Sequence, residues 1–313
     1  MAVSSQNSQV KSKNRKQRNN RFKGLLLVVV LRILSLLPFG FAQRIGHLMG
    51  KLASSLPGKL KTTTQKNLVL CFPDASQYEI QQLFRQTFLH SGMLAVEMAL
   101  AWLWPVEKCL KQIRNIHDKN ILDRAMRGGT GVICIVPHLG NWEFLNYHIL
   151  DSYPGMAMYK PAKIPALNDL ILNGRKQSGL EMASADASGV KAVFKHLKKG
   201  GVVFILADQE PDEKSGIFAP FFGIPALSMT LIAKLTQRTN ARVIAAFAKR
   251  LDDHLGFDVY YKSGSEKLYS SDLLEAVTAL NELVESCVQD IPEQYQWTYK
   301  RFKKRPGDAA RFY

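Results

Sequence analysis

One histidine in this sequence has a glutamate five residues after it: His138 and Glu143, in the stretch GVICIVPHLGNWEF. The apolar run Val132–Val136 predicts a buried strand of a parallel sheet, which ends just before His138. If a helix begins near Trp142, Glu143 lies in its first turn, where the helix dipole favours a carboxylate. A carboxylate that orients the imidazole would make His138 a general base at the carboxyl end of a strand, where open α/β folds place their chemistry. The alternative is a structural histidine beside a helix start, with Glu143 as an ordinary first-turn acid.

Polar residues follow two other predicted strands as well. Lys160 comes directly after Met156–Tyr159, and Arg175 follows in the same segment of chain. The strand Val202–Ala207 is followed by Asp208–Gln209–Glu210. Because parallel strands end at one edge of a sheet, these groups are expected near His138. A solvated helix face for Arg175 and a turn or helix cap for Asp208 remain alternatives.

The elements that would position these residues alternate along the chain. Further strands are expected at 243–248 and 257–261, and helices at 165–178, 189–199, 228–238 and 272–289. Upstream, Ser76 and Glu79 form a candidate capping box for a long helix over 74–104, and a shorter helix is expected over 119–127. Alternating strands and helices predict an α/β fold, with a largely parallel central sheet and helices on both faces. The APFFG segment at 219–223 is expected to be a loop that either plugs the core or walls an apolar channel.

Composition excludes several classes of protein. The chain has 313 residues and 46% hydrophobic residues, which fits one large globular domain or one domain with an appendage. Its four cysteines are far apart and favour free thiols in a reducing compartment. The sequence contains no P-loop, no G-x-G-x-x-G, no G-x-S-x-G elbow and no metal-ligand spacing, so nucleotide binding, a serine-hydrolase site and a metal site are not supported.

The net charge of +16 is concentrated at the N-terminus. Before Asp74 there are 13 of the 42 Lys and Arg residues and no acidic residue. A polar basic tail (1–23) precedes an apolar segment (24–42, GLLLVVVLRILSLLPFGFA) that is expected to be a membrane-anchoring helix, with the catalytic domain over 43–313. Such a block attracts anionic headgroups. A signal peptide is an alternative, although the cleavage pattern is poor, and both a shallow span and an interfacial helix fit the length and flanking charges.

A histidine–carboxylate pair without a Ser or Cys nucleophile can take a proton from a hydroxyl, which then attacks an activated acyl group. With a membrane anchor and a surface that attracts phosphate, this indicates acyl transfer to a hydroxyl of an anionic lipid. The motif HLGNWEF resembles the H-x4-D/E motif of the lysophospholipid-acyltransferase superfamily. Four further blocks are similar to the bacterial lipid A biosynthesis (late) acyltransferases: NLVLCFPD, YKP with the later GRKQSG, ADQEPDEKSGIFAPFFG, and PEQYQWTYKRFKKRP.

That resemblance implies a family function and site. It implies an acyl chain on acyl carrier protein as donor, a phosphorylated lipid A precursor as acceptor, no cofactor, and a place on the cytoplasmic face of the inner membrane without a nucleic-acid partner. His138 would be the base and Glu143 its orienting carboxylate. Arg175 and Asp208 would match active-site groups, with Gln209 and Asn141 inside the matching motifs as further substrate contacts. Lys160 stands where the family more often has arginine, which puts its phosphate contact in doubt because lysine lacks the bidentate fork.

Two other classes of function stay open at this point. One is a membrane-bound module that binds nucleic acid or protein through the basic tail and has no need of His138. The other is an acyltransferase for a different lipid, such as a lysophospholipid or an amino-acid lipid.

Overall fold

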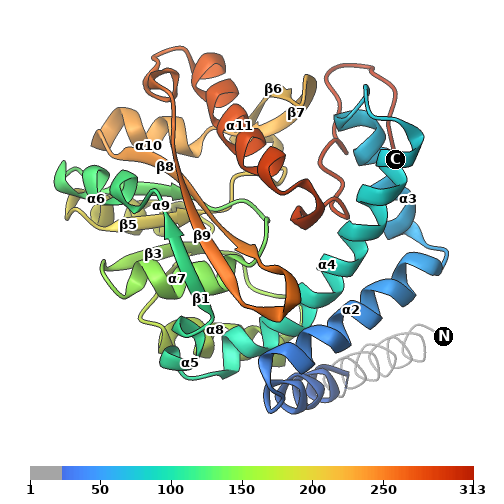
Figure 1. Ribbon diagram of the computed structural model, residues 1–313. Helices are drawn as coiled ribbons and strands as arrows, with labels where there is room; N and C mark the ends of the chain where they lie inside the picture. Colours follow the sequence, from blue (N-terminus) through green and yellow to red (C-terminus); the bar gives the residue numbers. More distant parts are fainter. Residues whose placement is uncertain (1–22) are drawn as a thin grey trace, which may run out of the picture.

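A seven-stranded sheet organises the protein in the computed structural model, which describes residues 23–313 (Figure 1). The strand order is β1-β9-β8-β2-β5-β3-β4. All neighbours are parallel except β8 and β9, which are antiparallel, so the expectation of a largely parallel sheet is confirmed. The strands are β1 (Ile113–His117), β2 (Val132–Ile135), β3 (Gly155–Tyr159), β4 (Glu181–Ser184), β5 (Val202–Ile205), β8 (Arg242–Arg250) and β9 (Phe257–Ser263).

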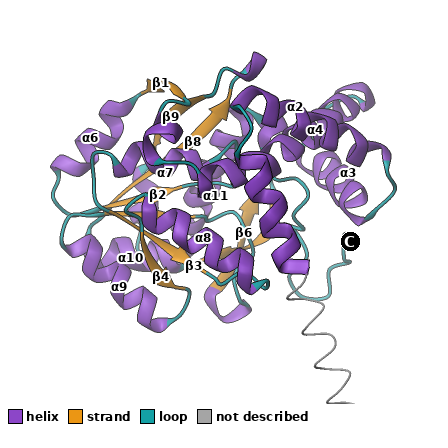
Figure 2. Ribbon diagram, turned by 90° about the horizontal axis from the view of Figure 1, so that it is seen from below, coloured by secondary structure: helices purple, strands orange, loops and turns teal. Residues whose placement is uncertain are grey.

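Helices bury both faces of this sheet (Figure 2). Along β2, Ile133 and Ile135 belong to one apolar cluster, whereas Val132 and Cys134 belong to the other, because successive side chains of a strand point to opposite faces. This explains why β2 reads as an unbroken apolar run. The helices are α2 (Phe39–Ser55), α3 (Lys59–Cys71), α4 (Gln77–Leu103), α5 (Val106–Leu110), α6 (Lys119–Arg127), α7 (Trp142–Leu150), α8 (Pro165–Gln177), α9 (Ala187–Lys198), α10 (Leu231–Thr239) and α11 (Leu273–Asp290).

The capping box at the start of α4 is confirmed, since Ser76 and Glu79 exchange side-chain and backbone hydrogen bonds. Some strands differ from the sequence-based expectations. Strands β1 and β4 were not expected, and the segment that includes APFFG is a two-stranded hairpin, β6 (Gly216–Phe221) and β7 (Ile224–Met229), rather than a loop. Phe221 from this hairpin is buried in the core, so the segment plugs the interior.

The expected helix over 24–42 is interrupted. Residues 23–35 are helical, residues 36–38 break the helix, and α2 begins at Phe39 with Pro38 as its N-cap. Proline lacks an N–H donor and fixes φ, which explains a break at this point. In the part of the chain that the structure describes, no helix is long and apolar enough to cross a membrane. The proposed basic tail lies outside the described residues except for Lys23.

Helices α2, α3 and α4 lie together on one side of the molecule (Figure 1). Glycines allow α2 and α4 to approach closely. A Cβ on Gly50 would lie 2.2 Å from the Phe88 carbonyl oxygen, and one on Gly92 would lie 2.2 Å from the Gly46 oxygen. Any side chain there would push the helices apart. The close contact packs α2 against α4, and α4 also contacts α7 and α8.

Candidate active site

His138 and Asp208 meet at the carboxyl ends of two neighbouring strands. β2 and β5 are parallel, and Ile135 pairs with Ile205 at their ends. His138 and Asp208 each lie three residues beyond that pair, so the strand register itself brings them together. The Asp208 carboxylate accepts two hydrogen bonds from His138, at 2.9 Å from its backbone N–H and 2.9 Å from Nδ1. Both the backbone and the ring of the histidine are therefore fixed by one acid.

The geometry determines which ring nitrogen is free to act. A carboxylate only accepts hydrogen bonds, so Nδ1 of His138 carries the proton and Nε2 presents a lone pair. Gln209 Nε2 lies 3.2 Å from His138 Nε2, and the same amide nitrogen donates to Gln296 Oε1 at 3.1 Å. Nε2 is thus the position at which a substrate proton can be accepted, once the Gln209 amide gives way.

Burial and hydrogen bonding act in opposite directions on Asp208. Its side chain is only 1% exposed, and burial by itself raises the pKa of a carboxyl group. The charge of the His138 ring and the hydrogen bonds from His138 outweigh burial, so the pKa of Asp208 lies below its ordinary value. Asp208 therefore remains ionised and stabilises a positive charge on the ring when His138 takes up a proton.

Glu143 occupies a different position from the one expected. Its carboxylate accepts hydrogen bonds from Arg175, at 3.2 Å from Nε and 2.5 Å from Nη2. Glu143 is buried, and Arg175 keeps 18% of its side chain exposed. Burial opposes the charged form of Arg175, but the Glu143 carboxylate raises its pKa above the ordinary value. The acid that orients His138 is therefore Asp208, and the expectation that Glu143 does so is wrong.

The turn between His138 and α7 is held by buried polar groups. Gly140 has φ +58°, and a Cβ there would lie 1.9 Å from the Ala248 carbonyl oxygen, so only glycine fits. Asn141 caps α7 by accepting hydrogen bonds from the backbone N–H groups of Glu143 and Phe144. Asn141 is fully buried, so the structure places it as a helix cap and not, as expected, as a substrate contact.

Glu97, which the sequence did not single out, holds this turn from α4. Its carboxylate accepts from Asn141 Nδ2 at 2.9 Å and binds both Nε and Nη2 of Arg250 at 2.5 Å. Gln43 of α2 donates to the same carboxylate at 2.7 Å. Glu97 is the one acid in the apolar stretch MLAVEMALAWL. That is the signal that could have identified it, because a buried acid needs a partner.

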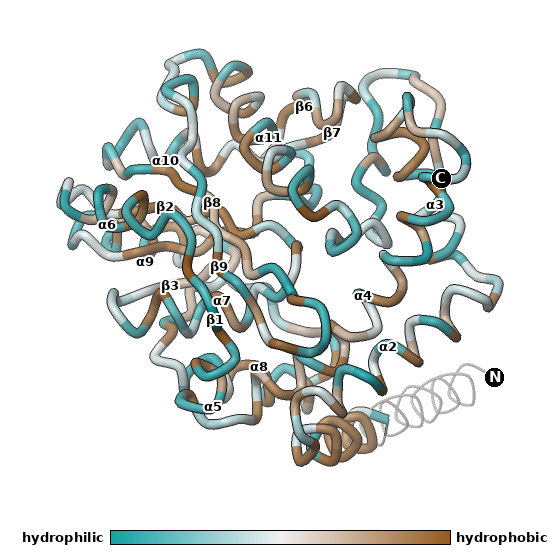
Figure 3. Tube along the Cα trace, in the orientation of Figure 1, coloured by the Kyte–Doolittle hydropathy of each residue, from teal (hydrophilic) through white to brown (hydrophobic). Residues whose placement is uncertain are grey.

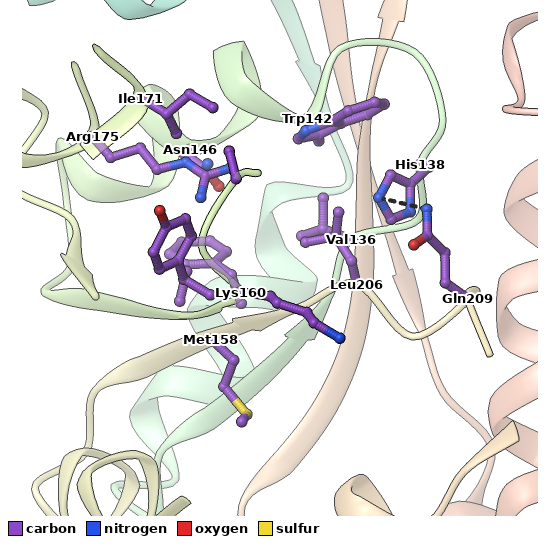
Figure 4. A pocket seen from close by; sticks show the side chains of 14 residues that line it. Val136, His138, Trp142, Asn146, Met158, Lys160, Ile171, Arg175, Leu206 and Gln209 are labelled. Carbon is purple, nitrogen blue, oxygen red and sulfur yellow. Dashed lines mark hydrogen bonds between the residues drawn. The ribbon is translucent and has the colours of Figure 1, made fainter. Parts of the chain in front are cut away.

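A cavity of about 350 Å³ opens beside the histidine. His138 and Gln209 lie on one side of it and Arg175 on the opposite side (Figure 4). Trp142 forms part of the wall, with its ring 4.9 Å from the His138 ring in an edge-on arrangement. Lys160 also lines the cavity, and the apolar lining consists of Val136, Ala157, Met158, Ile171, Phe204 and Leu206. The cavity thus combines one base, two cations and an apolar wall.

Metal ligands are not grouped in the region that the structure describes, where no cluster of three or more His, Cys, Asp or Glu side chains could hold an ion. The four cysteines are buried free thiols. Burial raises the pKa of Cys109 and of Cys287 to about 12, so these groups stay protonated. At this site His138, which can accept a proton at Nε2, lies next to charged and apolar groups that can bind a substrate.

Comparison with known proteins gives consistent matches over nearly the whole chain. The family model described as bacterial lipid A biosynthesis acyltransferase matches residues 11–304. The chain is 28% identical over 285 residues to the lipid A biosynthesis lauroyltransferase of Escherichia coli (strain K12), covering 90% of this chain and 92% of that protein. It is 27% identical over 278 residues to the E. coli lipid A biosynthesis palmitoleoyltransferase, covering 88% and 90%. A Haemophilus influenzae lipid A biosynthesis acyltransferase is 26% identical over 287 residues, covering 90% and 91%.

Proposed function

Because the chain belongs to the bacterial lipid A biosynthesis acyltransferase family, we propose that it moves a fatty acyl chain from acyl carrier protein to a hydroxyl of a phosphorylated lipid A precursor. The family model and the relatives are all described as acyltransferases of lipid A biosynthesis. The observation that carries the proposal is the His138–Asp208 pair at the edge of a cavity with an apolar wall and basic groups. The pair suits the removal of a hydroxyl proton, and the wall suits an acyl chain.

The reaction follows from the order of these groups. The acceptor hydroxyl replaces the Gln209 amide at Nε2 of His138 and transfers its proton there as its oxygen attacks the thioester carbonyl. Asp208 stabilises the imidazolium that forms, as carboxylates do for histidine bases. When the tetrahedral intermediate collapses, the carbon–sulfur bond breaks and the thiolate takes the proton from His138. The new ester and the free thiol leave the ring neutral again.

Arg175 serves this reaction through its fixed position. Its Nε and Nη2 are bound to Glu143, which holds the guanidinium of α8 against α7. Its Nη1 takes no part in that ion pair and is available for an anionic group of the substrate. Lys160 adds a second positive charge to the same cavity without the bidentate geometry. In this proposal both cations bind substrate, and Glu143 positions one of them.

We further propose that the N-terminal region holds the enzyme on an anionic membrane. Within the described chain, most exposed large apolar side chains lie between residues 25 and 69: Leu25, Leu26, Val29, Val30, Ile33, Leu36, Phe41, Leu48, Met49, Leu52, Leu56, Leu60 and Val69. Figure 3 shows the apolar residues of the first described helix beside α2. The same region contains only basic charges. An apolar surface flanked by cations suits anionic headgroups. In this proposal the enzyme therefore lies on the cytoplasmic face of the inner membrane.

The test is a reconstituted transfer reaction. Purified full-length enzyme is mixed with acyl carrier protein that bears a defined acyl chain and with a phosphorylated lipid A precursor. The mass of the product is then measured by mass spectrometry. The expected product is the precursor plus one acyl chain, with a rate that falls about 10²- to 10⁴-fold in His138→Ala. Lysophospholipids and amino-acid lipids serve as competing acceptors in parallel. Transfer to one of those alone, or an unchanged rate in His138→Ala, would refute the proposal.

A further inference from the structure

A second cavity lies outside the active site, between the β6–β7 hairpin and the C-terminal segment. It has a volume of about 660 Å³. Five basic residues line it: Lys300, Lys303, Lys304, Arg305 and Arg311. Glu213 is the only acidic residue in its lining, and it pairs with Lys304. The positive charge remains in excess after Glu213 and the neighbouring Asp308 are both counted, so the cavity attracts anions.

Two of the five basic side chains, Lys300 and Arg305, lie against aromatic rings. The guanidinium of Arg305 lies 4.1 Å from the centre of the Phe312 ring and donates to the Pro225 carbonyl at 3.2 Å. Lys300 lies 5.2 Å from the centre of the Tyr313 ring. Across residues 23–313, Lys304 is the only one of the five in an ion pair. Aromatic and carbonyl contacts fix the position of a cation and leave its charge available for a ligand.

The cavity is connected to the catalytic loop. The backbone N–H of Lys304 donates to Glu210 Oε1 at 2.9 Å, and the backbone N–H of Glu210 donates to the Tyr299 hydroxyl at 3.0 Å. Glu210 directly follows Gln209, which contacts His138. One loop therefore links the base to the edge of the basic cavity. A substrate that has a hydroxyl at His138 and a charged group on a large polar head would have to reach both sites at once.

An apolar surface lies beside this cavity. Tyr313, which lines the cavity, donates from its hydroxyl to Asn67 of α3, and Lys66 donates to the Phe312 carbonyl at 2.5 Å. Figure 1 shows the C-terminus next to α3. Leu60 and Val69 of that helix are exposed. A ligand that places anionic oxygens in the cavity would have apolar surface next to it, which favours an anionic lipid over a soluble anion.

We propose that this basic cavity binds a phosphoryl or carboxylate group on the polar head of the acyl acceptor. The inference rests on the proposed function, since it takes the acceptor to be an anionic glycolipid. Binding the head away from His138 would position the acceptor hydroxyl and so favour one hydroxyl over others. The concave shape suits a small anionic group that enters it, whereas an acidic protein surface would meet only the exposed tips of Lys303 and Arg311.

The test compares two charge-neutralising double variants of the full-length enzyme. Lys303→Gln with Arg311→Gln removes two exposed cations of the cavity. Lys191→Gln with Lys195→Gln removes two exposed cations of α9 and is the matched control. Initial rates are measured in mixed micelles against a series of acceptors that lack one anionic group at a time. The cavity variant is expected to raise the acceptor KM about 10-fold and to leave the donor KM at the wild-type value, because charge-assisted contacts to the acceptor are lost.

The acceptor series provides the sharper readout. For the acceptor that already lacks the bound group, the penalty of the cavity variant should largely disappear, because two changes at one contact are not additive. Equal kinetics of the cavity and control variants on every acceptor would overturn the proposal. A rise confined to the donor KM would overturn it too and would assign the cavity to binding of the acyl carrier protein.

A binding measurement separates this proposal from the proposed reaction. Wild-type and variant enzymes are titrated with micelles containing the phosphorylated acceptor or its dephosphorylated form, without any donor. Weaker binding of the cavity variant to the phosphorylated form alone supports the site even if no acyl transfer occurs. Equal binding of the cavity and control variants rejects the site even if transfer to lipid A precursor is established.

Discussion

Exchanging the two buried acids for their amides distinguishes the roles of Asp208 and Glu143. In Asp208→Asn the amide oxygen can replace only one carboxylate oxygen, and its NH₂ group can only donate. If that oxygen still accepts the hydrogen bond from the His138 backbone N–H, the NH₂ group faces Nδ1 of His138. Nδ1 must then accept a hydrogen bond and cannot carry the ring proton. The ring proton moves to Nε2, and the lone pair that should take the substrate proton is lost. We expect kcat to fall about 10²- to 10⁴-fold.

Glu143→Gln should behave differently because it leaves the His138–Asp208 pair intact. It breaks the ion pair with Arg175 and leaves a largely buried guanidinium without its counter-charge. Full burial would make this cost about 3–5 kcal/mol. The 18% exposure of Arg175 reduces that cost. A chain of this size loses roughly 2 °C of Tm per kcal/mol, so a fall of several degrees is expected. The loss in kcat should be smaller than that of Asp208→Asn.

The two variants are compared by initial rates of acyl transfer in detergent and by thermal unfolding of the same preparations. Wild-type enzyme and His138→Ala set the upper and lower limits of the rate. The reasoning is refuted if Asp208→Asn keeps the wild-type kcat. It is equally refuted if Glu143→Gln loses about 10³-fold in kcat at an unchanged Tm, since that would return the orienting role to Glu143.

Three further predictions concern binding, pH and the membrane. Arg175→Lys loses the two-point contact with its carboxylate, so we expect a lower Tm and about a 10-fold higher acceptor KM; unchanged kinetics would exclude a binding role. Burial and then the Arg250 charge lower the pKa of His90 to about 3, so the unfolded state binds more protons below pH 6.5 and stability falls as the pH drops. The free energy of unfolding of the wild type, measured in urea, should be roughly 1–2 kcal/mol lower at pH 5 than at pH 6.5. In His90→Gln this difference between the two pH values should be smaller. In density-gradient flotation with anionic vesicles, deletion of residues 1–21 should weaken binding only at low salt, whereas deletion of residues 1–42 should weaken it at high salt too; full flotation of the longer deletion would place the anchor elsewhere.

The main strands and the position of the base could be predicted from the sequence because the signal is local. Val132–Val136 is apolar at every position, as a strand buried on both faces must be, and His138 follows it immediately. The partner of His138 could not be predicted in this way. Strands β3 and β4 and three helices lie between β2 and β5 in the chain, and only the strand order makes β2 and β5 neighbours. Once that order is known, the equal offsets of His138 and Asp208 from a paired residue are sufficient to join them.

The hairpin β6–β7 was missed for a local reason. Its two-residue turn consists of Phe222 and Gly223, both with positive φ (49° and 72°). The usual sequence signal for such a turn is Asn-Gly or Asp-Gly, because a bulky residue rarely adopts this conformation. Packing of the Phe222 ring against Phe72 and Trp297 compensates for the strain. Prolines at 220 and 225 face each other across the strands and further weaken the strand signal.

The buried pair of Glu97 and Arg250 explains how an irregular turn can position a base reliably. A buried ion pair stabilises a fold only when its remaining donors and acceptors are satisfied. Glu97 accepts hydrogen bonds from Gln43 and Asn141 in addition to those from Arg250, and Arg250 donates a further hydrogen bond to His90. Asn141 in turn caps α7, the helix that contains Glu143. Helix α4, which contains Glu97, packs through glycines against α2, and α2 has an exposed apolar face. The surface proposed to meet the membrane and the turn that holds His138 therefore share one buried network. A shift of α2 relative to α4 would therefore alter the position of the turn after His138, through the hydrogen bonds of Gln43 and Asn141 to Glu97.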